Sequence, residues 1–252
     1  MSEHVKISRE GAVQIVRLDR PEKKNALTAA MYASLAEALN AASADDAIAV
    51  TVIFGQPGIF CAGNDIADFL AASQGGTILQ GFDLLKALAE GEKPLIAAAD
   101  GPAVGIGTTF MFHCDLVFAS PRATLQTPFV DLGLVPEAGS SLLGPRIVGL
   151  SRAFDLLVMG TPWSAEQAKE AGLVNAIVPA EELEGAALKA AEALAKKPRE
   201  ALRLARRLLR GDPAAIKARM EEEGKLFLER ITSDEAAAAF AAFLKKSARP
   251  AL

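Results

Sequence analysis

Apolar residues recur along this chain with two different spacings. Residues 12–18 nearly alternate between apolar and polar positions, while residues 48–54 and 95–99 are almost continuously apolar. These segments predict three strands, of which the two continuously apolar ones are expected to be buried. Apolar residues three and four positions apart separate the strands and predict helices over about residues 28–40 and 77–90. The first half of the chain therefore alternates strands with helices.

The second half has a different pattern. Residues 115–119 and 123–126 predict two short strands, and from Gly139 onward only helical spacing continues, with prolines at or near several helix starts. We expect a core domain over residues 1–195 and a C-terminal helical region over residues 196–252 that packs on a neighbouring subunit. The predicted helices of this half cover residues 141–148, 151–159, 165–171, 181–195, 199–209, 214–230 and 235–245.

Composition narrows the class of protein. The 252 residues are 51% hydrophobic, which is ample for a large core. A net charge of −4 and a pI near 5.4 give no basic field for nucleic acid. The apolar segment 101–112 is too short to span a bilayer, and the first residues lack the apolar stretch of a signal peptide. Two cysteines do not suggest a disulfide framework. These features predict a cytoplasmic protein with no membrane partner.

Histidine is rare in this chain. His4 and His113 are the two present, and the apolar residues around His113 favour a buried structural role for it. A histidine-based metal site would need both of them, so we expect no metal. Any acid/base chemistry is then expected to come from a carboxylate.

Two glycine turns follow predicted strands and open into apolar segments. Residues 60–65 read Phe-Cys-Ala-Gly-Asn-Asp, and residues 101–109 read Gly-Pro-Ala-Val-Gly-Ile-Gly-Thr-Thr. Such turns leave backbone N–H groups unpaired, and these can hold an oxygen that becomes anionic during a reaction. Phe110 replaces the third small residue of a dinucleotide fingerprint, and no Gly-Lys-Ser/Thr sequence follows either turn. For one such turn, an ordinary strand–helix connection is the favoured explanation. Two turns that could donate to the same oxygen are a reason to consider thioester chemistry, but they leave the ordinary explanation open until their exact residues are matched.

Taken together, these turns resemble those of the enoyl-CoA hydratase/isomerase (crotonase) superfamily. The likeness runs in order along nearly the whole chain, and it implies the crotonase-like α/β (α+β) fold of repeated ββα units with a C-terminal helical region. It also implies a homotrimer or a dimer of trimers. The matching segments are residues 20–27, 60–65, 100–107, 113–115, 132–141 and 171–175.

The resemblance implies a site in which two backbone N–H groups hold the oxygen of an acyl-CoA thioester. Carried over by position, the donors are the N–H groups of Asn64 and Ile106. Coenzyme A enters as part of the substrate, and no separate cofactor is expected. In the family, the last helix sometimes contacts CoA bound to an adjacent subunit. The positions implied for CoA binding are Lys24, Ala26, Cys61, Ala62, Gly63, Asn64, Asp65, Ile66, Gly105, Phe243 and Lys246.

The carboxylates distinguish between the reactions of this family. Hydratases use two glutamates, and the corresponding positions here are Thr109 and Phe129, neither of which is acidic. Glu137 instead stands where Δ3,Δ2-enoyl-CoA isomerases carry their single acid/base. Apolar neighbours such as Leu134 are expected to raise its pKa. On pattern alone, the favoured explanation of Glu137 is an acid in the first turn of the helix that starts near Gly139, where it interacts well with the helix dipole, and the resemblance reverses that preference. Asp65 has a similar alternative explanation as a first-turn acid.

The resemblance therefore predicts an enoyl-CoA isomerase that converts 3-enoyl-CoA to trans-2-enoyl-CoA. Within the same class, a sluggish hydratase or a thioester hydrolase is the alternative, although we find no water-activating group for it. From a different class, a non-catalytic acyl-CoA-binding paralogue would keep the two turns without using Glu137. Acyl-chain length depends on about residues 66–80 and does not follow from their composition.

Overall fold

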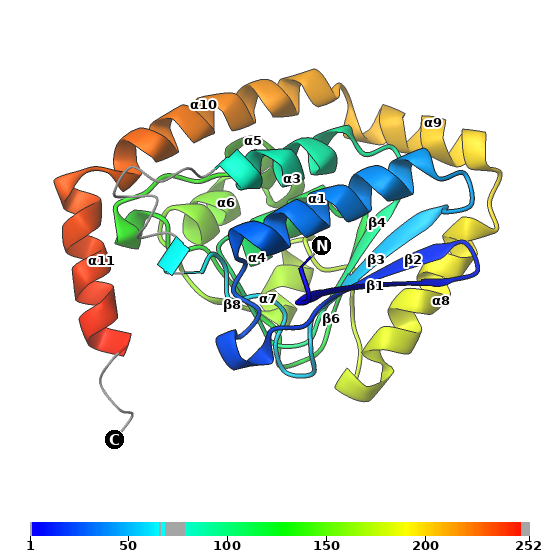
Figure 1. The fold of residues 1–252 in the computed structure, drawn as a ribbon, viewed down its shortest axis with the longest axis horizontal. Coiled ribbons are helices and arrows are strands. Elements are labelled where there is room, and N and C mark those ends of the chain that lie inside the picture. The colour runs from blue at the N-terminus through cyan, green and yellow to red at the C-terminus, as the bar shows by residue number, and fades with distance from the viewer. Residues whose placement is uncertain (1, 66, 69–78, 248–252) are drawn as a thin grey trace.

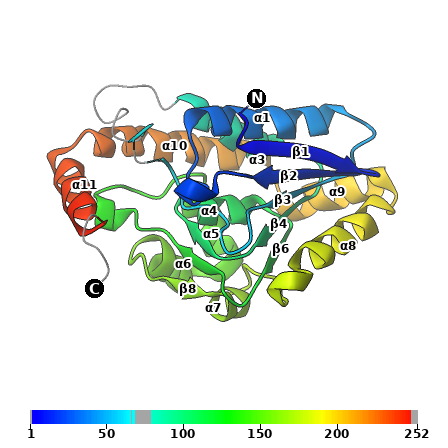
Figure 2. The same cartoon turned by 60° about the horizontal axis from the view of Figure 1, so that its bottom comes forward.

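A twisted six-stranded sheet forms the centre of the described part of the chain, in the order β1-β2-β3-β4-β6-β9 (Figures 1 and 2). The computed structural model describes residues 2–65, 67–68 and 79–247. β1 is antiparallel to β2, and the other neighbours in this sheet are parallel. The strands are β1 (Val5–Glu10), β2 (Val13–Leu18), β3 (Val50–Phe54), β4 (Leu95–Ala99), β6 (Leu116–Ala119) and β9 (Ala176–Ile177).

The two faces of this sheet build two separate cores. Alternate residues of β4 divide between them: Ala97 faces the larger core, while Ile96 faces the smaller one. Helices α1 (Ala29–Ala44) and α3 (Leu79–Glu90) cover the larger core, and α8 (Leu183–Ala195) covers the smaller one from the opposite side (Figures 1 and 2). Strands buried on both faces explain why β3 and β4 are apolar at nearly every position.

A small second sheet in the described chain, in the order β5-β7-β8, lies beside the first glycine turn. Its strands are β5 (Pro102–Val104), β7 (Thr124–Gln126) and β8 (Trp163–Ser164). β5 runs directly into α4 (Ile106–Thr109), which continues as the 3-10 helix η2 (Phe110–His113). The other short 3-10 helices of the described chain are η1 (Pro21–Lys23), η3 (Val130–Leu132) and η4 (Ala180–Glu182).

The remaining described helices come after β7 in the chain. α10 runs along the top of the view in Figure 1, and α11 descends at its left-hand end. α11 packs against η3 of the same chain, since Cα and N of Ala236 lie where a side chain at Gly133 would be. These helices are α5 (Ser140–Val148), α6 (Leu150–Leu157), α7 (Ala165–Glu170), α9 (Arg199–Arg210), α10 (Pro213–Ile231) and α11 (Asp234–Ser247).

The structure confirms most predicted elements and corrects the reading of the second half as helical alone. β8 and β9 were not predicted, because each has two residues and is held only by its partner strand. β1 was also missed, since five of its six residues are exposed and give no apolar alternation. Among the described helices, none is long and apolar enough to cross a membrane.

Candidate active site

Backbone hydrogen bonds join the two glycine turns side by side. Cys61 N–H donates to Pro102 O over 3.0 Å, and Val104 N–H donates to Cys61 O over 2.8 Å. Gly63 and Gly107 allow this close approach: a Cβ on Gly63 would lie 3.0 Å from Val104 O, and one on Gly107 would lie 2.6 Å from Cys61 O. The two turns are therefore so close together that both positions must be glycine, because a side chain at either one would collide with the opposite turn.

The two backbone donors that the resemblance implies are left unpaired. Within the described part of the chain, neither Asn64 N–H nor Ile106 N–H donates a hydrogen bond to a protein acceptor. Ile106 is the first residue of α4, where an N–H has no partner in its own helix. Gly105 precedes it with φ of 55° and donates its own N–H to Gln126 O over 2.8 Å. The turns thus present free donors, as expected of a site for a developing oxyanion.

A third segment, residues 24–27, forms the other side of the Asn64 turn. Ala62 N–H donates to Lys24 O, Leu27 N–H donates to Gly63 O, and Asp65 N–H donates to Leu27 O, each over 2.8 to 2.9 Å. Lys24 has φ of 52°, and its side chain is exposed. These contacts bring Lys24 and Ala26, predicted to bind CoA, beside the predicted positions Cys61 to Asp65.

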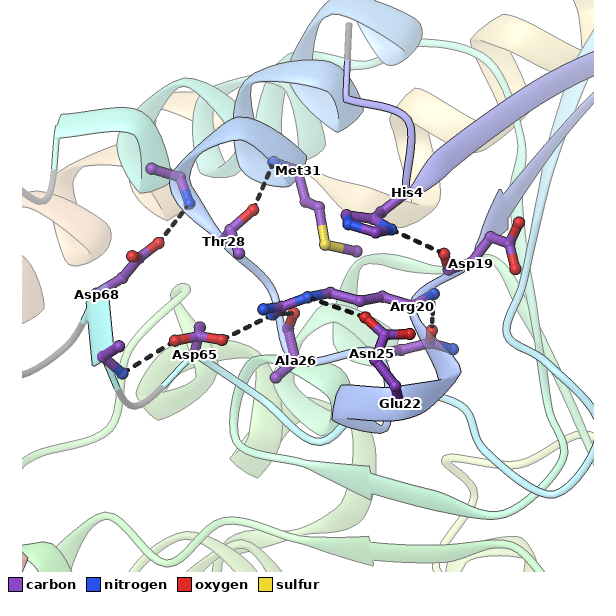
Figure 3. A network of polar contacts seen from close by, with 12 residues as sticks. His4, Asp19, Arg20, Glu22, Asn25, Ala26, Thr28, Met31, Asp65 and Asp68 are labelled. Atoms are coloured by element: carbon purple, nitrogen blue, oxygen red, sulfur yellow. Dashed lines mark hydrogen bonds and ion pairs between the residues drawn. The ribbon is translucent and has the colours of Figure 1, made fainter.

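The Arg20 side chain connects these segments (Figure 3). Its Nη1 donates to Ala26 O over 2.9 Å and to Asp65 Oδ2 over 2.7 Å, and both charged side chains are nearly buried. Burial alone would raise the pKa of Asp65, but the hydrogen bond and charge of Arg20, together with backbone hydrogen bonds from Ala67 and Asp68, outweigh that effect and lower the pKa. Asp65 Oδ1 also accepts from Ala67 N–H over 2.9 Å. Asp65 is therefore an ion-paired residue of the turn, and pattern alone did not indicate Arg20 as its partner.

Glu137 lies on the turn between η3 and α5, and its carboxyl meets α4. Thr109 Oγ1 donates a hydrogen bond to Glu137 Oε1 over 2.5 Å. Thr109, at the position of the first hydratase glutamate, is therefore in direct contact with Glu137, at the position of the isomerase acid/base. Phe129, at the second hydratase position, is buried in the larger core. Glu137 does not lie in the first turn of α5, because that helix begins after its N-cap residue, Gly139.

Burial raises the pKa of Glu137 to about 8. The Thr109 hydrogen bond lowers this pKa in part, and the negative charge of Glu223 raises it further. The residue as a whole is half-buried, while its carboxyl is surrounded by protein. The prediction that its surroundings raise the pKa of Glu137 is confirmed in direction. A carboxyl with this pKa can both accept and return a proton near neutral pH.

Tyr32 of α1 is a residue of this region that sequence reasoning missed. Its hydroxyl donates to the side-chain Oδ1 of Asn64 over 2.5 Å. Burial raises the pKa of Tyr32 well above its ordinary value, and the charge of Glu137 raises it further, so the phenol is neutral and lies within the field of Glu137. It fixes the side chain of Asn64 while leaving the backbone N–H of that residue free.

The other predicted site residues are not brought together with this group. Phe243 is exposed on α11, and the side chain of Lys246 lies outside what the structure describes. Ile66 lies outside the described residues, as does most of the segment 66–80 that was expected to set chain length. His113 is fully buried, and burial lowers its pKa to about 4, which confirms its structural role.

Known proteins are similar to this chain in fold and in sequence. A family model described as enoyl-CoA hydratase/isomerase matches residues 8–250. The crystal structure of an enoyl-CoA hydratase/isomerase from Pseudoalteromonas atlantica T6c superposes with a TM-score of 0.92 at 38% identity, covering 97% of this chain and 98% of that one. Enoyl-CoA delta isomerase 2 of Rattus norvegicus is 34% identical over 254 residues, which are 97% of this chain and 64% of the rat protein. The 2,3-dehydroadipyl-CoA hydratase of Escherichia coli K12 is 35% identical over 251 residues, 98% of this chain and 97% of that protein.

The fold and the joined turns define a protein of the crotonase superfamily. Within that class, the chain belongs to the enoyl-CoA hydratase/isomerase family. It spans less than two thirds, 64%, of the length of the rat isomerase that it resembles, and its relatives include both isomerases and hydratases.

Proposed function

We propose that this protein isomerises 3-enoyl-CoA to trans-2-enoyl-CoA, with Glu137 as its single acid/base. The observation that carries the proposal is the contact of Glu137 with Thr109, because the hydroxyl of Thr109 stands at the position of the first hydratase glutamate and leaves Glu137 as the one carboxyl in this contact. Acyl-CoA is the substrate class implied by the family, and CoA enters as part of that substrate.

The reaction needs one group that moves a proton and one site that holds negative charge. The ionised Glu137 carboxylate takes a proton from C2, and the electron pair of that C–H bond delocalises through the thioester carbonyl and the C3–C4 double bond as a dienolate. The N–H groups of Asn64 and Ile106 donate to the dienolate oxygen. The protonated Glu137 then returns the proton to C4, and the double bond moves to C2–C3. Atoms and charge balance without a co-reactant.

The pKa of Glu137 suits both halves of this cycle. A base with a pKa near 8 takes a C2 proton more readily than an ordinary carboxylate with a pKa of about 4.3. The oxyanion donors supply the other part of the barrier reduction, and the loss of one such donor typically costs about 3 kcal/mol. Both contributions depend on excluding water, which agrees with the burial around Glu137.

The alternatives differ from this proposal in the groups they require. A hydratase or thioester hydrolase must activate water, and Thr109 and Phe129 carry no carboxylate for that task. The similarity to a hydratase at 35% identity keeps this reaction as the second candidate. A non-catalytic acyl-CoA-binding paralogue would have no use for a carboxyl whose pKa is raised to about 8.

The binding residues and the assembly remain part of the proposal. We place CoA along Lys24, Ala26 and residues 61–65, where the three joined segments meet. Ile66, Gly105, Phe243 and Lys246 complete the proposed CoA contacts, with the last two contributed by α11 of an adjacent subunit in a homotrimer or dimer of trimers. A cytoplasmic location and a lack of nucleic-acid partners also remain expectations.

The test separates isomers of the substrate at constant mass. Wild-type protein, Glu137→Gln and Asp131→Asn are incubated with 3-hexenoyl-CoA and with 2-hexenoyl-CoA, and the products are resolved by chromatography and mass spectrometry. Asp131 is the matched control because it is an exposed carboxylate on the adjacent η3. Conversion of the 3-enoyl to the 2-enoyl isomer, lost only in Glu137→Gln, supports the proposal. A rapid gain of one water that persists in Glu137→Gln overturns it.

A further inference from the structure

The turn that presents Glu137 has a backbone that its own sequence does not favour. Ala138 has φ of 60° and Gly139 has φ of 70°, so two consecutive residues lie in the left-handed region. Alanine is disfavoured there because its Cβ crowds the backbone. Gly139 is also the N-cap of α5, and it has no side chain to pair with the first N–H groups of that helix. Contacts from elsewhere in the fold must therefore hold this turn.

Glu223 of α10 supplies the main contact, from 84 residues away along the chain. Its Oε2 accepts from Gly139 N–H over 2.6 Å, and its Oε1 accepts from Ser141 N–H over 2.9 Å. The side chain is 4% exposed, so the carboxylate is committed to these two donors. Both oxygens act as acceptors, which is the arrangement that suits the ionised form at a helix N-terminus.

Two further contacts hold the same turn. His113 Nε2 lies 2.7 Å from Ala138 O and donates to it as the neutral ring. Arg219, one turn before Glu223 on α10, donates to Ser141 Oγ over 3.1 Å. The C-terminal helical region therefore reaches the base of the candidate active site as well as the outer surface.

We propose that Glu223 is a positioning residue for Glu137: its carboxylate holds the left-handed turn in place and contributes the nearby negative charge against which Glu137 ionises. This inference rests on the proposed function of Glu137 only for its effect on the reaction rate. The structural coupling between the two carboxyls can be measured without substrate.

The charges around Glu137 identify Glu223 as the group to alter. From α1, Tyr32 faces it as a neutral phenol, because the pKa of Tyr32 is raised well above its ordinary value. From η2, the nearby His113 is neutral at pH 7, because burial lowers its pKa to about 4. From α10, the charge of Glu223 raises the pKa of Glu137. Burial raises the pKa of Glu223 itself, and its hydrogen bonds to Ser141 and Gly139 and the charge of Arg219 offset part of that rise. Removal of the Glu223 charge should therefore lower the pKa of Glu137.

The test uses Glu223→Gln with Glu221→Gln as its matched control. Both variants remove one carboxylate from α10, but Glu221 is exposed, and the turn's Gly139 and Ser141 N–H groups donate to Glu223 instead. Each full-length protein is labelled with glutamate carrying 13C at Cδ, and the carboxyl resonances are titrated from pH 5 to 10. The Glu137 resonance is assigned by its absence from Glu137→Gln. The kcat and KM for 3-hexenoyl-CoA are measured across the same pH range.

We expect the Glu137 midpoint to fall by about 0.5 to 1 pH unit in Glu223→Gln and to stay in place in Glu221→Gln. We also expect kcat to fall about 10- to 100-fold with KM changed less than about threefold, because displacement of the acid/base affects chemistry more than binding. A midpoint and kcat equal to those of Glu221→Gln would overturn the proposal.

Two further comparisons keep the result interpretable. Glu223→Asp keeps the negative charge but shortens the side chain, which withdraws the carboxylate oxygens from the N–H groups of the turn. We therefore expect kcat to fall, while the titration midpoint of Glu137 moves less than in Glu223→Gln. If Glu223→Gln does not fold, unchanged kcat in Glu223→Asp overturns the positioning role. If the midpoint moves in Glu223→Gln but Glu137→Gln keeps full isomerase activity, the proposed function fails while the coupling stands.

Discussion

Thr109 donates a hydrogen bond to Glu137 across 2.5 Å, and this contact joins the helix after the second glycine turn to the only acid proposed for catalysis. The hydroxyl stabilises the carboxylate and so opposes the effect of burial on its pKa. The two residues are 28 positions apart, and each has a simple local explanation when considered alone. Because the two side chains are in contact and only Glu137 carries a carboxyl group, a reaction that uses a single carboxylate is a specific hypothesis for this chain.

The pH dependence of the reaction follows from the pKa of Glu137. The free protein must hold Glu137 ionised to accept the C2 proton, and its pKa is raised to about 8. We expect kcat/KM to rise with pH and to reach half of its plateau near pH 8. A pH–rate profile from pH 5.5 to 9.5 checks this, and a flat profile above pH 6 would contradict the assignment of Glu137 as the base.

Substitution of Thr109 by valine should move that profile toward higher pH. The change removes the hydrogen bond that lowers the pKa of Glu137 while keeping a side chain of similar shape. We expect a shift of about 0.5 to 1 unit, as for the loss of a hydrogen bond to a charged group. Thr124→Val, on an exposed position of β7, is the control and should leave the profile unchanged. A shift to lower pH in Thr109→Val would refute the stated role of the hydroxyl.

The same pKa has a consequence for folding stability. Because the pKa of Glu137 is higher in the folded protein than in the unfolded chain, its contribution to stability is complete below pH 4 and is lost as the pH rises toward 8. Glu137→Gln, which carries no charge at any pH, should therefore gain thermal stability relative to wild type as pH rises from 4.5 to 8.5. Melting temperatures of both proteins over this range test the sign, and a constant difference would contradict it.

The ion pair between Arg20 and Asp65 should be important for stability. Arg20→Ala leaves the nearly buried Asp65 carboxylate without its partner, and we expect a loss of about 3 kcal/mol in the free energy of unfolding. Arg9→Ala is the control, because its pair with Asp45 is half-exposed and should contribute less than about 1 kcal/mol. Urea denaturation measures both. Equal losses would mean that the burial of the Arg20 pair has no energetic consequence.

Gly107→Ala tests whether the spacing of the two turns matters for catalysis. A methyl group there would lie 2.6 Å from Cys61 O and would force the turns apart. Since a displacement of about 1 Å can cost about 100-fold in rate, we expect kcat to fall by about that factor. Gly185→Ala in α8 is the control: its methyl group meets nothing within 4 Å and should stabilise the helix by about 0.5 to 1 kcal/mol. Wild-type kcat in Gly107→Ala would argue against a shared oxyanion site.

The sequence predicted the elements that carry their own signal. Buried strands β3 and β4 are apolar at almost every position, and Met31, Leu35 and Leu39 mark the buried stripe of α1. Thr28 caps that helix as its residue type suggests, by accepting from Met31 N–H. In contrast, β8 and β9 escaped prediction because two residues carry no periodicity and gain their order from a partner strand.

For the candidate site, local pattern was enough to indicate the glycine turns and the lack of a histidine base. Resemblance to a family was needed to separate Glu137 from an ordinary acid placed before a helix. Neither source indicated Tyr32, Arg20 or Glu223, because each acts on a segment far away in the chain and has an unremarkable local sequence.

The sequence by itself determined the strands and helices that bury apolar residues, the absence of paired hydratase carboxylates, and the two turns with free N–H groups. Only the tertiary structure decided which charges meet. Burial raises the pKa of Glu137, Thr109 lowers it in part, and Glu223 of α10 holds the turn beneath it. The physical reason is that burial and Coulomb interactions depend on distance in space, and that distance is set by packing between segments that the chain order leaves far apart.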